Sequence, residues 1–135
     1  MKIFKKFSME SSRSAEVSIV SFRGCKFFSS DRNKIEAALR LPRDWHGRPR
    51  YDRLNFSVVE EILTSGDVCF DVGANIGVYT CVFAHLCGDS SGVHAFEPAG
   101  HIRKKLVRNI RLNGFDGVRV NPFGLGDRES EVNFF

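Results

Sequence analysis

Two carboxylates and two glycines stand at spacings that suit the binding of a nucleoside. Asp71, Gly73 and Gly77 lie within the stretch VCFDVGANIGVYT, and Glu97 lies in the later stretch VHAFEP. A glycine turn that opens a helix presents amide N–H groups and a partial positive charge, which together hold a phosphate or a carboxylate. A glutamate after the next strand can accept hydrogen bonds from both hydroxyls of a ribose. These residues therefore predict a βαβ unit that binds a nucleoside-containing cofactor.

The spacing of the glycines separates two classes of cofactor. Asn75 stands where the dinucleotide-binding pattern G-x-G-x-x-G has its middle glycine, which lets the backbone approach a pyrophosphate. Asp71, at the end of its strand, repels phosphate oxygens and suits the ammonium group of a methionine. We therefore predict S-adenosylmethionine as the cofactor, with an NAD-binding unit as the less favoured alternative. The predicted binding residues are Asp71, Gly73, Ala74, Asn75, Gly77 and Glu97.

Alternating strand and helix patterns place these residues in an α/β unit. The patterns predict strands over residues 68–72, 93–97 and 118–123, helices over residues 75–87 and 100–112, and a further short strand that residues 131–135 could form. A capping-box spacing in SVVE, which begins at Ser57, predicts another helix that ends at Gly66. We therefore expect the strands of this unit to form a parallel sheet.

The segment before this unit has a different character. Period-two alternation predicts a hairpin over residues 16–22 and 25–28, and a capped apolar pattern predicts a short helix over residues 31–41. Two prolines, a glycine and Trp45 make residues 42–50 the best candidate for a linker. We therefore predict a basic N-terminal segment, residues 1–50, and a partial cofactor-binding domain, residues 51–135.

Composition excludes several classes of function. The basic residues of the N-terminal half are scattered and accompany no nucleic-acid-binding motif, so we predict a solvated basic face and no nucleic-acid partner. No apolar run approaches the length of a transmembrane segment, and no apolar core of a secretory signal follows the basic start, which predicts a cytoplasmic protein. The four cysteines form no C-x-x-C pair and the four histidines show no ligand spacing, so we predict no metal site and cysteines that fill the core.

The stretch GDVCFDVGANIGVYT resembles the first motif of the FkbM family of S-adenosylmethionine-dependent methyltransferases, and AFEP resembles the second. The segments NIRLN and GLGD also fall where this family has similar segments, so that the resemblance covers roughly residues 51–135. It implies methyl transfer to a hydroxyl of a sugar or secondary metabolite, and hence a small-molecule or glycan acceptor. It also implies that Asp127 lies near the adenine.

The resemblance further implies a Rossmann-like, doubly wound methyltransferase sheet with more strands than this sequence supplies. The first three parallel strands are present, whereas the fourth strand and the acidic motif that follows it are missing, so we expect an incomplete sheet and can name no catalytic residue. A truncated methyltransferase is the favoured interpretation. The alternatives are a non-catalytic module that pairs with another chain and, less favoured, an NAD-binding unit. An open sheet edge would favour self-association.

Overall fold

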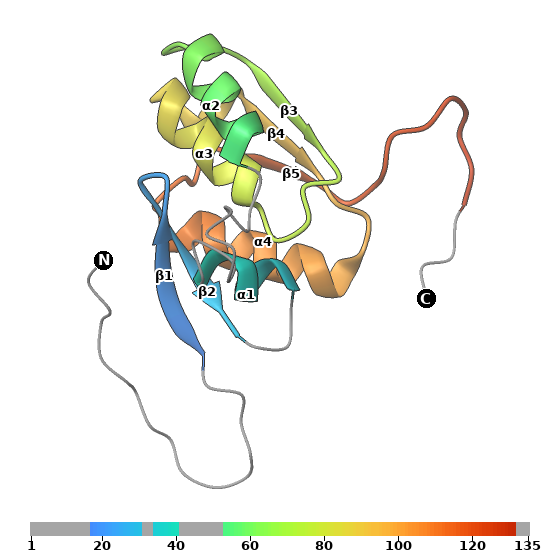
Figure 1. Cartoon of the computed structure of the whole chain (residues 1–135). Helices are drawn as coiled ribbons and strands as arrows, with labels where there is room; N and C mark the ends of the chain where they lie inside the picture. Colours follow the sequence, from blue (N-terminus) through green and yellow to red (C-terminus); the bar gives the residue numbers. More distant parts are fainter. Residues whose placement is uncertain (1–16, 31–33, 41–52, 132–135) are drawn as a thin grey trace, which may run out of the picture. The chain divides into compact units, whose positions relative to one another are not determined.

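The structure of the chain is a computed structural model that describes residues 17–30, 34–40 and 53–131. The chain divides into two compact units, residues 1–62 and residues 63–135 (Figure 1). The boundary predicted between residues 50 and 51 lies outside the described residues, as does the predicted linker, so both stay predictions.

In the part that the structure describes, the first unit contains an antiparallel hairpin and two helices. Its elements are β1 (Ser18–Phe22), β2 (Cys25–Ser29), α1 (Lys34–Arg40) and α2 (Arg53–Ile62). Arg23 and Gly24 join the strands with φ angles of 50° and 80°, the left-handed conformations that a tight two-residue hairpin turn requires. The predicted hairpin is therefore confirmed, and the short helix that follows it is confirmed over its described part.

The start of α2 differs from the prediction. The helix begins before Ser57, which lies in its interior and does not cap it. Phe56 is fully buried, and its ring packs edge-on against Phe22 of β1 with the ring centroids 5.2 Å apart. Such tertiary packing contributes most of the stability of a short helix, and a local capping pattern does not reveal it. The helix also ends at Ile62, whereas Gly66 lies in a later turn with a φ of 89°.

Residues 63–131, the described part of the second unit, form a three-stranded parallel sheet with helices between its strands. Its elements are β3 (Cys69–Val72), α3 (Val78–Cys87), the 3₁₀ turn η1 (Ser90–Gly92), β4 (Val93–Phe96), α4 (Gly100–Leu112) and β5 (Arg119–Asn121). The strand order is β3-β4-β5, and Figure 1 shows α3 and α4 on one side of the sheet. This arrangement confirms the predicted α/β class with parallel strands. Of the strand predicted over residues 131–135, residues 132–135 lie outside the described part.

The helix-facing side of the sheet holds the core of this unit. Cys69 pairs with Val93 in the register of β3 and β4, and both pack with Ala84 and Cys87 of α3. The sulfur atoms of Cys69 and Cys87 are 3.6 Å apart, and all four cysteines of the chain are buried free thiols. Burial raises the pKa of Cys69 to about 12, with a further contribution from Cys87. The cysteines therefore fill the core, as predicted.

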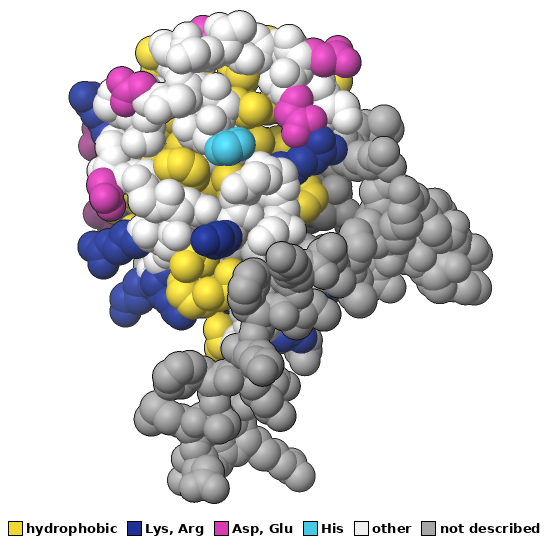
Figure 2. All heavy atoms as spheres, turned by 90° about the vertical axis from the view of Figure 1, so that its left-hand side faces the viewer, with side chains coloured by type: hydrophobic (Ala, Val, Ile, Leu, Met, Phe, Trp, Pro, Cys, Tyr) yellow, Lys and Arg dark blue, Asp and Glu magenta, His cyan; other side chains and the backbone are white. Residues whose placement is uncertain are grey.

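The surface of the molecule carries charges of both signs. Figure 2 shows acidic and basic side chains on one face, with apolar side chains exposed between them. None of the helices in the described ranges combines the length and the apolar character needed to cross a membrane. The cytoplasmic location and the lack of a nucleic-acid partner stay predictions.

The opposite side of the sheet is apolar and exposed. Val68 just before β3, and Phe70 and Val72 within it, are 65%, 61% and 58% exposed. The ring of Phe70 lies 6.0 Å from that of Phe96, which lies 5.8 Å from that of Phe123, so an aromatic row crosses the sheet. Within the described residues β3 pairs with β4 alone, which leaves its other edge open. Exposed apolar surface beside an unpaired edge favours association between chains.

We expect the chain to self-associate through this face and edge, and Phe70→Lys to lower the associated fraction, because the substitution places a charge within the apolar row. Light scattering across a concentration series measures the effect. Ser91→Lys adds the same charge at an exposed position of η1 and is the matched control. Equal association of the two variants would contradict the assignment of this face.

Candidate functional site

The predicted site residues meet where β3 and β4 end. The two strands are parallel and stay in register up to the pair Val72 and Phe96, so the segments that follow them leave the sheet at the same edge. Residues 73–77, which we call the glycine turn, follow β3, and Glu97 follows β4. The hydrogen bonds described below join Gly73, Ala74, Asn75 and Gly77 to one another or to the end of β4, including Glu97. Asp71 lies in β3, two residues before the glycine turn.

The glycine turn holds three residues in the left-handed conformation. The φ angles of Gly73, Asn75 and Gly77 are 77°, 50° and 86°. A residue with positive φ does not continue a right-handed helix, so α3 begins at Val78 and not at Asn75, where the sequence pattern placed its start. Asparagine tolerates this conformation better than most residues do. The residue that departs from the dinucleotide pattern therefore still fits the backbone of the turn.

The two glycines have different surroundings. A Cβ atom on Gly73 would meet nothing within 4 Å, so the space beside this residue is open. A Cβ atom on Gly77 would come within 2.4 Å of Leu106 Cδ1 in α4. Gly77 therefore allows α4 to pack closely on the turn.

Glu97 joins the two connections that leave the sheet. Its Oε2 accepts a hydrogen bond from the amide of Asn75 at 2.9 Å, and its Oε1 accepts one from the amide of Ala99 at 2.9 Å. Ala99 is the residue that caps the start of α4. The carboxylate is 7% exposed, so these two bonds fix it at the edge of the site.

Arg103 stabilises the chain around Glu97 from α4. Its Nη1 donates hydrogen bonds to the carbonyl oxygens of Glu97 and Pro98 at 2.8 and 2.9 Å. Arg103 is half-buried, because the carbonyl groups at the end of the strand lie within reach of the first turn of α4. Helical periodicity predicts which face of a helix a residue occupies. It does not predict which carbonyl group the side chain will reach.

Asp71 is a buried carboxylate beside the first turn of α3. It is 9% exposed, and the hydroxyl of Thr80 donates a hydrogen bond to its Oδ2. Burial raises the pKa of Asp71, hydrogen bonds from Thr80 lower it, and the negative charge of Glu97 raises it, so that the net shift is upward. No cation from the described part of the chain contributes to this shift. Two carboxylates held in this way form an acidic site, which favours a positively charged ligand.

The amides of the glycine turn are already engaged. Those of Gly73 and Ala74 donate to the carbonyl of Phe96, and that of Gly77 donates to the carbonyl of Ala74. The amide of Asn75 donates to Glu97, and that of Ile76 donates to the side chain of Asn75. The expectation that these groups would hold an anion is therefore not met within residues 73–77.

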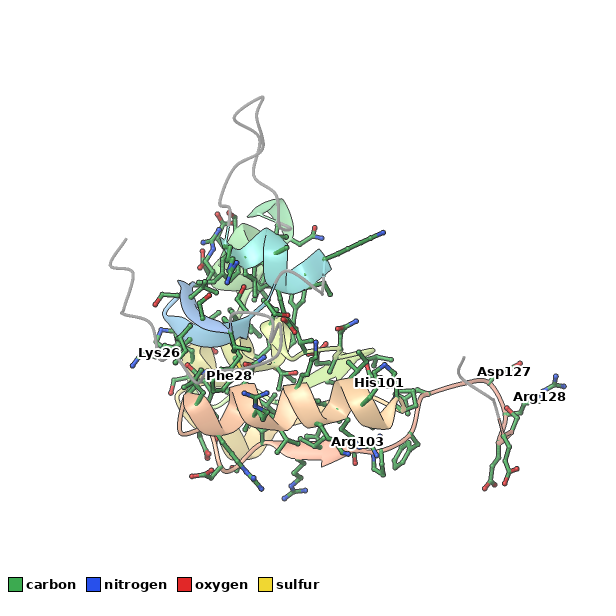
Figure 3. All side chains as sticks on the ribbon, turned by 90° about the horizontal axis from the view of Figure 1, so that it is seen from below. Lys26, Phe28, His101, Arg103, Asp127 and Arg128 are labelled. Atoms are coloured by element: carbon green, nitrogen blue, oxygen red, sulfur yellow. The ribbon has the colours of Figure 1, made fainter. Side chains whose placement is uncertain are left out.

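Asp127 lies away from the first turn of α4. Figure 3 shows Asp127 and Arg128 on the extended segment after β5, away from His101 and Arg103 of α4. Asp127 is exposed there, so its role beside an adenine stays a prediction. Across the described ranges, no three or more His, Cys, Asp or Glu side chains form a group that could hold a metal ion.

Comparison with known proteins shows a strong similarity to a methyltransferase. Over 63 residues, 44% of this chain, the sequence is 62% identical to 31-O-demethyl-FK506 methyltransferase FkbM from Streptomyces tacrolimicus. The match spans 24% of that relative, so the chain covers about a quarter of its length. No family model matches the chain. The similarity confirms the resemblance to FkbM methyltransferases that the motifs predicted.

The close approach of α4 predicts a difference between the two glycines. Gly77→Ala should destabilise the fold by about 1–3 kcal/mol more than Gly73→Ala does, because both residues have positive φ but only the first substitution crowds Leu106. Urea unfolding of the two variants measures the difference. Equal losses would show that α4 yields to the added methyl group.

The raised pKa of Asp71 predicts a gain in stability for Asp71→Asn. The folded pKa lies above the ordinary value of 3.8, so ionisation of Asp71 penalises the folded state above both pKa values, and the penalty disappears below 3.8. Asn keeps an acceptor for the Thr80 hydroxyl and carries no charge. We expect the variant to melt at a higher temperature than the parent at about pH 7 and the difference to vanish as the pH falls through that window. A lower melting temperature at neutral pH would contradict this account.

Proposed function

We propose that this chain binds S-adenosylmethionine at the carboxyl ends of β3 and β4, as the cofactor-binding part of a methyltransferase. The observation that carries the proposal is the buried carboxylate of Asp71, close enough to Glu97 to interact with its charge. Burial and the negative charge of Glu97 both raise the pKa of Asp71. S-adenosylmethionine carries a sulfonium and an ammonium group, and when bound it supplies an electrophilic methyl group. The similarity to a named methyltransferase supports the reaction class.

Each carboxylate has a distinct role in this proposal. An ionised carboxylate oxygen has two lone pairs, and each oxygen of Glu97 uses one for a backbone amide. The remaining lone pairs suit the two hydroxyls of a ribose. Asp71 suits the ammonium group, and the open space beside Gly73 leaves room for the ligand to approach the backbone. Ala74 and Asn75 shape the turn between these two groups.

The same geometry disfavours a dinucleotide. A pyrophosphate needs amide donors at the glycine turn, and the amides from Gly73 to Gly77 already donate within the chain. Asp71 would also repel the phosphate oxygens. An NAD-binding unit is therefore the weaker proposal.

The proposed methyl acceptor is a hydroxyl group of a small molecule or glycan. The name of the relative states a 31-O-demethyl substrate, which is an oxygen acceptor. A base near that hydroxyl would assist the transfer, but we assign this role to no residue of the chain. The alternative is a non-catalytic module that binds the cofactor and pairs with another chain. Cofactor binding without methyl transfer would distinguish this module from a methyltransferase.

Titration calorimetry with S-adenosylmethionine, its demethylated product S-adenosylhomocysteine, and NAD tests the proposal. We expect the first two to bind and NAD not to bind. Glu97→Gln should weaken binding by about 1–3 kcal/mol, because the new amide group replaces an acceptor and faces a backbone N–H. Glu129→Gln, at an exposed position of the segment after β5, is the matched control.

Two results would contradict the proposal. Binding of NAD in preference to S-adenosylmethionine would assign the site to a dinucleotide. Unchanged affinity in Glu97→Gln would remove this carboxylate from the ligand site, whatever the parent chain binds.

A further inference from the structure

The helix α4 contributes a buried polar residue to the glycine turn. Asn109 is 2% exposed, and its Nδ2 donates a hydrogen bond to the carbonyl oxygen of Ile76 at 2.8 Å. Ile76 is itself fully buried in the middle of the turn. A polar side chain on the apolar stripe of a helix is unusual, and here it has a specific acceptor.

The carbonyl of Ile76 needs this partner because of the shape of the turn. The hydrogen bonds of α3 begin with the amide of Cys81 and the carbonyl of Gly77 at 3.0 Å, so the carbonyl of Ile76 lies outside the helical ladder. A buried carbonyl without a donor is costly, because it has lost water and gained nothing. Asn109 satisfies it from a residue far along the chain.

Three successive residues of the turn are therefore held by Glu97 and by two side chains of α4. Glu97 accepts from the amide of Asn75, Asn109 donates to Ile76, and Leu106 packs on Gly77. The left-handed conformation of a residue such as Asn75 persists only where its surroundings over-determine it.

We propose that Asn109 is a positioning residue of the cofactor site, an inference that rests on the function proposed above. Asn109 fixes the peptide group between Ile76 and Gly77 and thereby maintains the conformation of the turn, including that of Asn75. The amide of Asn75 in turn donates to one oxygen of Glu97. Loss of the bond to Ile76 lets the turn relax and releases one side of the carboxylate that would contact the ribose. Asn109 acts through these groups and does not itself touch the ligand.

The test compares the same substitution at Asn109 of α4 and at Asn113, the residue that caps the end of α4. Asn109→Asp keeps the size of the side chain and removes the donor to Ile76. Asn113→Asp is the control, because Asn113 donates to the main-chain carbonyl of Asn109 at 2.7 Å, at the end of the helix. Calorimetry with S-adenosylhomocysteine, melting temperature, and hydrogen exchange of the amides from Gly73 to Gly77 are measured for both variants of the full chain.

We expect Asn109→Asp to bind S-adenosylhomocysteine at least about tenfold more weakly than Asn113→Asp, with correspondingly faster exchange at the amides of Asn75 and Gly77. Asn109→Asp should also lose more melting temperature, because it leaves the buried carbonyl of Ile76 without its donor. Binding and exchange are therefore compared well below the lower of the two melting temperatures, where both variants are folded. If Asn109→Asp does not fold, Asn109→Ser carries the same expectation, because its hydroxyl is too short to reach Ile76.

Affinity and exchange that match the Asn113→Asp control would overturn the inference. A parent chain that does not bind S-adenosylhomocysteine would overturn the proposed function instead. In that case faster exchange in Asn109→Asp would still support its hold on the turn, and unchanged exchange would reject it.

Discussion

The hydrogen bonds of the Glu97 carboxylate are the constraint on which this edge of the sheet depends. One side chain accepts from the amide of Asn75 after β3 and from the amide of Ala99 before α4. Bonds to a charged acceptor are shorter and stronger than neutral ones, and burial strengthens them further. The group proposed to contact the ligand is therefore also the group that joins the two connections, so that recognition and architecture share one residue.

Asp71, at the same end of the sheet, lowers the stability of the fold instead of raising it. Its carboxylate is buried near a second carboxylate, which raises its pKa and makes the ionised form costly to the fold. The hydroxyl of Thr80 offsets part of that cost. A polar arrangement that lowers the stability of the free protein is typical of a binding site, where the ligand supplies the missing charge.

Sequence predicted the elements whose limits are set locally. β4 is a short apolar run, and α4 ends near the Gly114 turn, so both were predicted almost to the residue. The starts of α2 and α3 depend instead on partners distant in sequence, namely the ring of Phe22 and the carboxylate of Glu97. The candidate site residues were chosen from motif spacing and stay a prediction. The hydrogen bond from Asn109 could not be predicted in this way, because spacing does not show which carbonyl a buried amide group meets.

Two buried thiols, Cys69 in β3 and Cys87 in α3, can report when the core of the second unit opens to solvent. Cys69 and Cys87 lie in contact within the core, and the raised pKa of Cys69 keeps it protonated at neutral pH. Only thiolates react readily with alkylating reagents, so labelling has to wait until the core admits water. The rate of labelling at Cys69 therefore follows the opening equilibrium of β3, the strand that ends at the candidate site, and the measurement needs no engineered cysteine.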